Sequence, residues 1–266
     1  PYDMRDNDLI FTASYTDPDM VYFKAKKQDS ENVYFFNTFT QILFDNPELT
    51  QEEAIRKIYP GISGTQTAEK LQQNFMADVY IQAAIRQEIV VQLIRNHVPV
   101  KLYGHNWDTF LTKAEVLMKD DLPFIKEFVK DCGEVMYGEL PKIYNNARLS
   151  INQLPWFKAG IHDRTPLALM NGCLSLTDAS TYLTDILNIG ENEGVYTYSL
   201  ENIEAVPDII MDILNNTADD NCVPEIINSL SDKDCVLENI NSLSDNARAY
   251  AHKHFSWKCW VDKFLD

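Results

Sequence analysis

The sequence predicts an α/β protein: a Rossmann-like parallel sheet with flanking helices, preceded by a helical segment. From about residue 98 onward, short apolar runs alternate with segments of helical periodicity, which is typical of a parallel sheet covered by helices. The first 75 residues read as mainly helical. We therefore expect a helical segment at 1–75, as a remnant of or linker from an N-terminal domain, and a Rossmann-like domain at 76–266. The stretch "NDLIFTASY" (7–15) reads as the last strand of such an N-terminal domain, or a remnant of it.

The helical segment contains recognisable helix boundaries. Its first apolar stretch at helical spacing stops at Asn46-Pro47. Thr50, followed three residues later by Glu53, forms a capping-box pattern that predicts the start of the next helix. A long amphipathic helix is then expected over 67–96.

Strands and helices alternate through the rest of the chain. Short strands are predicted at 98–104, 134–138, 148–152, 173–178 and 194–199. Helices are predicted between and after them at 124–133, 139–147, 165–172 and 200–216. This order is that of successive βα units, in which the carboxyl ends of the strands lie at one edge of the sheet.

The charge balance excludes some classes of partner. The formal net charge is −17, and residues 185–245 hold fourteen acidic residues against one Lys, a net of −13. Such a surface repels nucleic acid and anionic lipid, so we expect neither as a partner. An anionic ligand would need a local positive site.

Compartment and metal binding follow from what the sequence lacks. No run of about 18 uncharged apolar residues is present, so no transmembrane segment is predicted. The five cysteines are scattered without a Cys-x-x-Cys pair, so we expect neither a zinc site nor a disulfide framework, and a cytoplasmic location fits best.

The stretch "GIHDRTPLALMNGC" (160–173) offers such a positive site. It sets His162 and Arg164 beside a predicted helix start, with Thr165 as N-cap and Pro166 as first helical residue. Free N–H groups and the helix dipole would form an anion site there, with Gly160 allowing close backbone approach. In the alternative interpretation, Arg164 pairs with a surface carboxylate and His162 packs in the core.

At these residues the sequence resembles a family. "GEVMYGELPKIYNNARLSIN", "GIHDRTPLALMNGCLSLTD" and "AYAHKHFSWKCWVDKFL" follow in the order and spacing of CgeB-like (spore-maturation type) glycosyltransferases of the GT-B fold. The upstream stretch "IRQEIVVQLIRNHVPVKLYGHNW" also resembles that family. The match covers about residues 78–266 and corresponds to the C-terminal, nucleotide-sugar-binding half of a GT-B fold, ending in a helix that crosses back toward the other half.

The resemblance implies a donor site for a nucleotide-diphosphate sugar, with transfer of the sugar to an unknown acceptor and no metal or other cofactor. The residues implied to hold the diphosphate are Gly160, His162, Arg164 and Thr165. Weaker candidates are Gly104 and His105 on the turn facing the cleft, Val135, Met136 and Tyr137 near the base, and Asp163 as a substitute acid. For His105 an ordinary surface role stays open, as does a loop or capping role for Asp163.

The chain departs from the family pattern in places. Members of the family usually carry an acid three residues after the arginine, where this chain has Leu167. Wider relatives also carry an acid eight residues before that position, where this chain has Ala159. Trp156 and Phe157 could line the sugar pocket or anchor the loop. No catalytic base can be named, because the first 75 residues are too short for a full second domain. The alternative is therefore a non-catalytic relative that keeps the fold as an interaction module.

Overall fold

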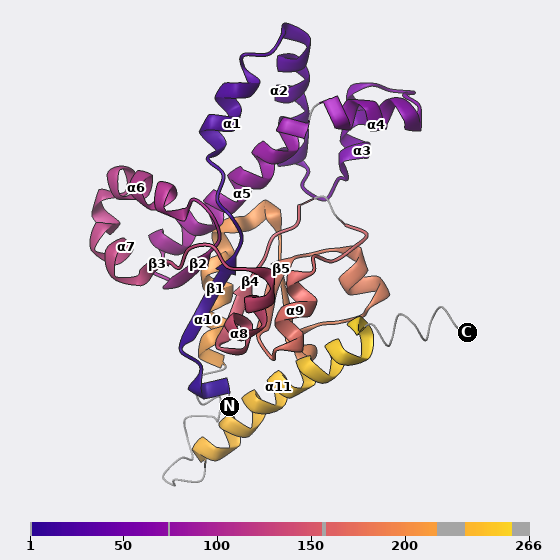
Figure 1. Cartoon of the computed structure of the whole chain (residues 1–266). Coiled ribbons are helices and arrows are strands. Elements are labelled where there is room, and N and C mark those ends of the chain that lie inside the picture. The colour runs from indigo at the N-terminus through magenta and orange to yellow at the C-terminus, as the bar shows by residue number, and fades with distance from the viewer. Residues whose placement is uncertain (1, 74, 156–157, 217–231, 257–266) are drawn as a thin grey trace.

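The computed structural model describes residues 2–73, 75–155, 158–216 and 232–256, and Figure 1 shows its arrangement. Six strands form one sheet in the order β3-β2-β1-β4-β5-β6, and every neighbouring pair is parallel. The strands are β1 (Asn7–Thr12), β2 (Val100–Tyr103), β3 (Val129–Asp131), β4 (Ala147–Ile151), β5 (Leu174–Asp178) and β6 (Val195–Tyr198). The predicted fold class, a Rossmann-like parallel sheet with flanking helices, is confirmed.

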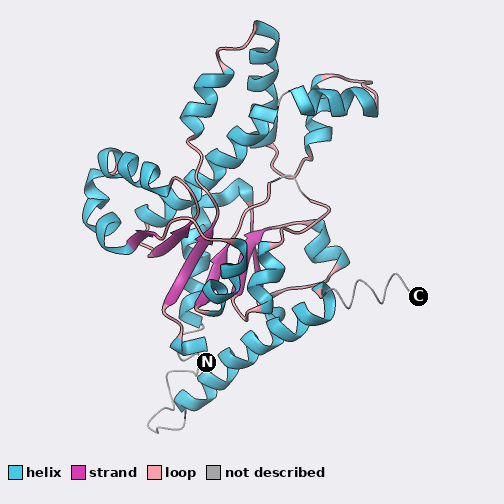
Figure 2. Cartoon of the chain, viewed as in Figure 1, coloured by secondary structure: helices cyan, strands magenta, loops and turns pink. Residues whose placement is uncertain are grey.

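Helices lie on both sides of this sheet (Figure 2). Those that follow the second and later strands are α6 (Trp107–Leu117), α7 (Leu122–Phe128), α8 (Leu140–Asn145), α9 (Arg164–Met170), α10 (Val206–Asn216) and α11 (Asp232–Phe255). Alternate residues of β1 face opposite layers: Leu9 and Phe11 belong to the core under α5 (Phe75–Arg95) and α10, whereas Ile10 packs with residues of α8 and α9. This alternation follows from the pleat of a strand covered on both faces.

The first strand corrects the sequence interpretation. Residues 7–15 are not the last strand of a preceding domain, because β1 lies in the middle of this sheet. Leu9 pairs in register with Leu149 of β4, and Phe11 pairs with Leu102 of β2. Strand pairing across about ninety residues leaves no local signal in the sequence. Residues 1–75 therefore supply the central strand as well as helices.

Between β1 and α5 the chain forms a helical arm that stands beyond the end of the sheet toward which the strands run (Figure 1). Its helices are α1 (Pro18–Ala25), α2 (Ser30–Asp45), α3 (Gln51–Ile58) and α4 (Gly64–Gln73). The predicted capping box is present: Thr50 N–H donates to the Glu53 carboxylate at 2.8 Å, and Glu53 N–H donates to the Thr50 hydroxyl at 3.3 Å. Buried Phe35 and Phe39, stacked with ring centroids 5.2 Å apart, hold the arm to the core.

Two element predictions differ from the structure. The strand expected at 134–138 is a loop followed by a 3-10 turn at Tyr137–Glu139, and the edge strand is instead β3, at the end of the predicted helix 124–133. Burial decides between them: Val129 is 3% exposed and pairs with Val100, whereas Met136 is 70% exposed. The helix expected over 67–96 is borne out by the described residues: 67–73 are helical in α4 and 75–95 in α5.

The last described helix, α11, packs along α9 and reaches the turn at Tyr2–Met4 (Figure 1). The aromatic tail from Trp257 onward, expected to form the crossing helix, lies outside the described residues. In the described part of the chain, no helix combines the length and apolar character needed to span a membrane.

Candidate functional site

A pocket of about 280 Å³ lies at the carboxyl edge of the sheet, above β1. β2 and β4 lie on either side of β1, so the chain leaves β1 in one direction along the sheet and leaves β4 in the other. This point is the topological switch point of the sheet. Open α/β sheets bind their ligands in the crevice at such a point. Four loops meet at it, those that follow β1, β2, β3 and β4. The lining residues are Thr12, Ala13, Ser14, Tyr103, Gly104, His105, Glu134, Val135, Tyr137, Leu140, His162, Asp163, Arg164 and Leu167.

Seven of the ten residues singled out in the sequence line this pocket together. They are Gly104, His105, Val135, Tyr137, His162, Asp163 and Arg164. Three do not line it. The carbonyl of Gly160 accepts from the Ser180 hydroxyl at 3.0 Å, Thr165 is buried, and Met136 is exposed on the rim. Trp156 and Phe157 lie outside the described residues.

Gly104 holds two of the loops together. Its φ is +143°, and a Cβ there would lie 2.5 Å from the carbonyl oxygen of Ala13. That same oxygen accepts from the indole N–H of buried Trp107 at 2.6 Å. The glycine is therefore required by close backbone approach, which brings the segment after β1 against the turn after β2.

His105 faces the pocket from this turn. Its Nε2 lies 3.0 Å from the Glu134 carboxylate, and both side chains are more than half exposed. Solvent screens such a pair, so it contributes little to stability. It places one imidazole and one carboxylate at the pocket mouth.

The start of α9 differs from the expected anion site. The helix begins at Arg164, so Thr165 is not its N-cap; Thr165 lies in the first turn, 1% exposed. The N–H groups of Arg164 and Thr165 donate to the ring and the carbonyl of His162, and Leu167 N–H donates to the Asp163 carbonyl. Pro166 has no N–H. The backbone donors of this turn are thus already bonded, and positive side chains must supply the attraction for an anion. Gly172, which follows the helix, has the left-handed conformation at φ +69°.

Arg164 supplies one such side chain. Its Nη1 donates to the Asn152 side-chain oxygen at 3.2 Å. Within the described residues, no carboxylate lies within 4.0 Å of its guanidinium, so the surface ion pair considered in the sequence is not found. Burial lowers the pKa of Arg164, although the group stays charged at neutral pH. Asn152 also keeps a buried amide nitrogen with no acceptor, so donors outnumber acceptors at this end of β4.

His162 lies beside Arg164 with its side chain 26% exposed. Burial, followed by the nearby Arg164 charge, lowers the pKa of His162 to about 4. The ring is therefore neutral at pH 7. Its Nδ1 contacts both the Asp163 carboxylate and the Arg164 backbone N–H. A neutral ring whose Nδ1 accepts from the Arg164 N–H carries its proton on Nε2, which is then a donor; a second proton would go to Nδ1, beside Asp163.

Sequence reasoning missed a second arginine beneath the pocket. Arg86, on α5, donates from Nη1 to the carbonyl of Ser14 at 2.5 Å. With the Gln153 amide oriented so that its oxygen faces the guanidinium, Arg86 Nη2 and Nε also donate to that oxygen, at 2.9 and 3.3 Å. Burial, with a smaller contribution from Arg164, lowers the pKa of Arg86 to about 10. One signal was available: Arg86 interrupts an apolar helix face between buried Ile85 and Ile89.

Apolar side chains also line the pocket. Leu140 and Leu167 are partly buried and pack with Tyr103 against the core on that side of the sheet. Tyr137, 64% exposed, stands on the rim with an open aromatic face. The pocket lining therefore combines cationic and apolar side chains, which suits an amphipathic anion.

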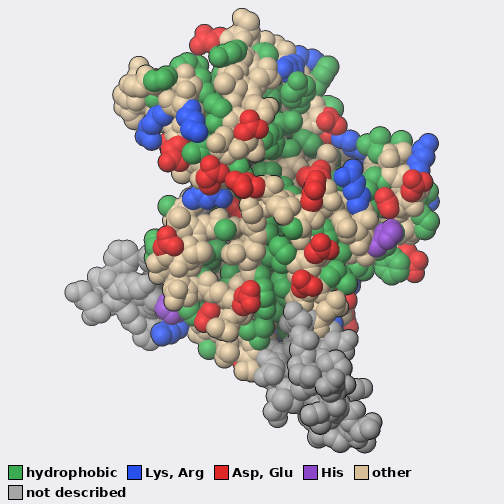
Figure 3. Space-filling view, turned by 180° about the vertical axis from the view of Figure 1, so that it is seen from behind, with side chains coloured by type: hydrophobic (Ala, Val, Ile, Leu, Met, Phe, Trp, Pro, Cys, Tyr) green, Lys and Arg blue, Asp and Glu red, His purple; other side chains and the backbone are tan. Residues whose placement is uncertain are grey.

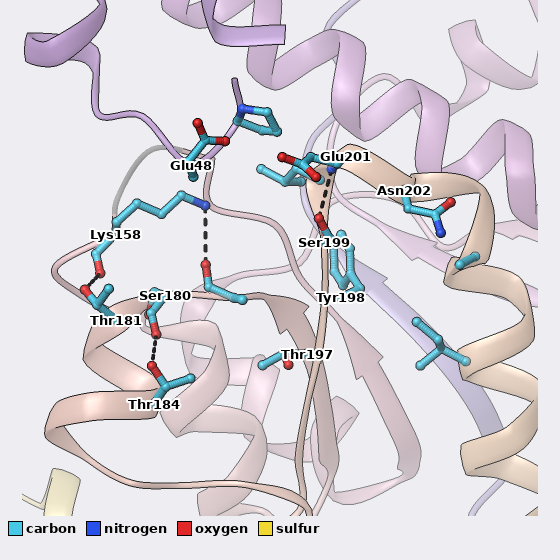
Figure 4. Close-up of a pocket in the computed structure, with 15 residues that line it drawn as sticks. Glu48, Lys158, Ser180, Thr181, Thr184, Thr197, Tyr198, Ser199, Glu201 and Asn202 are labelled. Atoms are coloured by element: carbon cyan, nitrogen blue, oxygen red, sulfur yellow. Dashed lines mark hydrogen bonds between the residues drawn. The ribbon is translucent and has the colours of Figure 1, made fainter. Parts of the chain in front are cut away.

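A second, larger hollow of about 570 Å³ lies along the same edge, at the ends of β5 and β6 (Figure 4). Its one positively charged lining residue, Lys158, donates to the Ala179 carbonyl at 3.3 Å and lies 3.8 Å from the buried Asp178 carboxylate. Glu48 and Glu201 also line it. This balance of charges does not suit a diphosphate. The larger of the two hollows is therefore not the better candidate for an anion site.

On the face shown in Figure 3, acidic groups are spread over the sheet-bearing part and basic groups are few and scattered. The described residues contain no group of three His, Cys, Asp or Glu side chains placed to hold a metal ion. Comparison of the chain with models of protein families and with curated proteins found no match.

Proposed function

We propose that this chain is a nucleotide-sugar-dependent glycosyltransferase, or the donor-binding half of one, which transfers a sugar from a nucleoside diphosphate to an unknown acceptor. One observation carries the proposal. Loops from four strands meet at the switch point of a parallel sheet around Arg164, whose guanidinium faces the pocket without a carboxylate partner in the described residues. The family resemblance of the sequence supports the same reading.

In this proposal different lining residues bind the diphosphate and the nucleobase of the donor. Arg164 donates to the diphosphate, the Nε2–H of His162 is a second donor, and the ring becomes cationic when it takes up a proton in the presence of the anion. The nucleobase of the donor lies toward Val135 and Tyr137, and the Tyr137 ring offers a surface on which it can stack. Charge develops on the leaving nucleoside diphosphate during transfer, so a fixed guanidinium lowers the barrier by electrostatic stabilisation, without a metal ion.

The structure supports no assignment of a catalytic base. Asp163 and Glu134, the acidic residues that line this pocket, each contact a histidine at the mouth. Leu167 leaves the ribose without the carboxylate that the family pattern would provide. We therefore assign donor binding to this pocket and leave the acceptor chemistry open.

A second candidate function is a non-catalytic relative that retains the fold as an interaction module. The bonded N–H groups at the start of α9 and the apolar Leu167 favour it, because both reduce what the pocket offers a nucleotide. The two candidates differ in whether a nucleotide binds.

Calorimetric titration with UDP, GDP, ADP and dTDP tests the proposal. We expect one nucleotide to bind with micromolar affinity and Arg164→Ala to weaken it by at least about tenfold, since a charge-assisted contact to phosphate is lost. Lys158→Ala is the matched control, because it removes a lysine from the neighbouring hollow, and its affinity should equal that of the unaltered chain. If none of the four nucleotides binds to well-folded protein, the non-catalytic alternative is favoured.

A further inference from the structure

Arg86 joins the two sides of the crevice. Ser14, whose carbonyl it holds, belongs to the segment after β1, and Gln153 follows β4 directly. The Ser14 hydroxyl in turn accepts from the His105 backbone N–H at 3.2 Å. One guanidinium on α5 thus ties together loops from β1 and β4 and, through Ser14, the turn after β2.

A comparison with Arg5 shows what is unusual here. Arg5 is also buried, at the opposite edge of the sheet, and donates to the carbonyls of Ala147 and Gly172 at 2.7 and 2.6 Å. Arg5 also donates to the Ser244 hydroxyl at 3.2 Å, so bonds to neutral oxygen atoms can account for a buried arginine in this fold. Both arginines have like charges nearby, Arg248 and Arg148 for Arg5 and Arg164 for Arg86, but only Arg164 lines the open pocket.

Two like charges in a poorly solvated site raise the energy of the folded chain unless a counter-charge is present. Neither guanidinium has a carboxylate within 4.0 Å among the residues that the structure describes. Asp163, beside His162, is 59% exposed, and Glu134 lies at the mouth beside His105. An anion bound at Arg164 would therefore also offset the positive charge of Arg86.

We propose that Arg86 is the inner cation of this pocket: it positions the loops after β1 and β4, and its charge adds to that of Arg164, so that the pocket selects a ligand group with at least two negative charges, such as a diphosphate. This inference rests on the proposed function for the identity of the ligand, but not for the role of the charge. Arg86 acts through position and field, and its side chain does not line the pocket.

The test uses pyrophosphate as the probe, with Arg86→Gln, Arg86→Lys and Arg5→Gln variants. We expect Arg86→Gln to weaken pyrophosphate binding at least about tenfold, because a buried charge acting on the anion is removed. Arg86→Lys keeps the charge and should retain most of the affinity. Arg5→Gln controls for the loss of a buried arginine as such and should bind like the unaltered chain. Nitrate, with a single charge, should bind all four proteins weakly, and Arg86→Gln should lower its affinity by a smaller factor than that of pyrophosphate.

A second readout needs no ligand. The Arg86 charge contributes to the lowered pKa of His162, after burial and Arg164 and against the opposing effect of Asp163. NMR titration of the His162 imidazole should give a higher pKa in Arg86→Gln, and an unchanged pKa in Arg86→Lys and Arg5→Gln. A purely structural role would not separate the lysine from the glutamine variant.

The outcomes separate this inference from the proposed function. Pyrophosphate binding that depends on the Arg86 charge, without binding of any nucleotide, supports the inner cation and overturns the donor site. Nucleotide binding with equal affinity in Arg86→Gln and an unmoved His162 pKa overturns the inner cation and leaves the donor site standing. A folded chain that binds neither probe overturns both.

Discussion

At the scale of single residues, the site depends on charges held where water cannot reach them freely. His162 shows the effect most directly, because burial and Arg164 together keep its ring neutral at pH 7. An imidazole beside a charged guanidinium stays neutral above about pH 4, and an anion that offsets the guanidinium charge raises its pKa. Ligand binding should therefore be accompanied by proton uptake below about pH 6.5.

The same shift predicts how stability depends on pH. The pKa of His162 falls from 6.5 in the unfolded chain to about 4 in the folded one, so between these values the unfolded state binds more protons. The contribution of His162 is thus complete above pH 6.5 and is lost as the pH falls toward 4. Urea unfolding at several pH values should show that the free energy of unfolding falls less steeply toward acidic pH in His162→Asn than in the unaltered chain. Parallel curves for the two proteins would contradict the prediction.

Gly104 makes a second residue-scale prediction. In Gly104→Ala the new methyl group meets the Ala13 carbonyl in a backbone conformation that favours glycine, so we expect a loss of about 3 kcal/mol in the free energy of unfolding. Gly138→Ala is the control, because a Cβ there has no neighbour within 4 Å and should change stability little. Chemical denaturation measures both. Equal stability of the two variants would show that the loops after β1 and β2 are not held in this way.

At the scale of elements, burial decided where the local pattern was ambiguous. Val129 and the residues after it could extend a helix by periodicity, but the edge of β2 was available for pairing and the chain formed β3 there. Conversely, the residues around Met136 resemble a short strand, yet they lack a buried side chain to hold one. Loop 134–136 thus remained free to line the pocket.

The capping box of α3 predicts a local effect. Thr50→Ala removes the side-chain acceptor for Glu53 N–H and should destabilise the first turn by about 1 kcal/mol. Hydrogen exchange should show faster exchange of the amides at 52–54 in Thr50→Ala, and Thr50→Ser should restore their protection. Because α3 lies in the arm, nucleotide affinity should not change. Unaltered protection in Thr50→Ala would argue that packing alone fixes this helix end.

At the scale of the whole molecule, the arm is an insertion within a single βα unit. The chain leaves β1, builds four helices, and returns through α5 to the same sheet. Residues on both sides of the insertion, Ser14 and Arg86, then meet under the pocket. The site therefore requires the N-terminal segment and the sheet together.

This topology predicts that residues 76–266 do not fold alone. Without β1, strands β2 and β4 lose their shared neighbour, and the apolar residues on both faces of the central strand leave the core. We expect that fragment to show no cooperative thermal transition by circular dichroism, whereas 1–266 shows one. A sharp transition in the fragment would instead mean that residues 76–266 form an independent domain.

What the sequence determined by itself is largely local. Periodicity and capping residues predicted α2 and α3 of the arm, the strands at 148–152 and 173–178, and the α/β class, because these patterns depend on neighbours within a few residues. Placing His162 and Arg164 after a strand also placed them at the carboxyl edge. The resemblance supplied the idea of a donor site, which stays a proposal.

Only the tertiary structure decided which distant segments meet. It placed β1 at the centre of the sheet, put Ser14 and Arg86 in contact, and showed the backbone donors of α9 already bonded. Strand pairing and the environment of a charge depend on contacts between residues far apart in the chain. A local pattern carries no record of such contacts, and the ion-pair state of Arg164 could therefore be resolved only in the folded molecule.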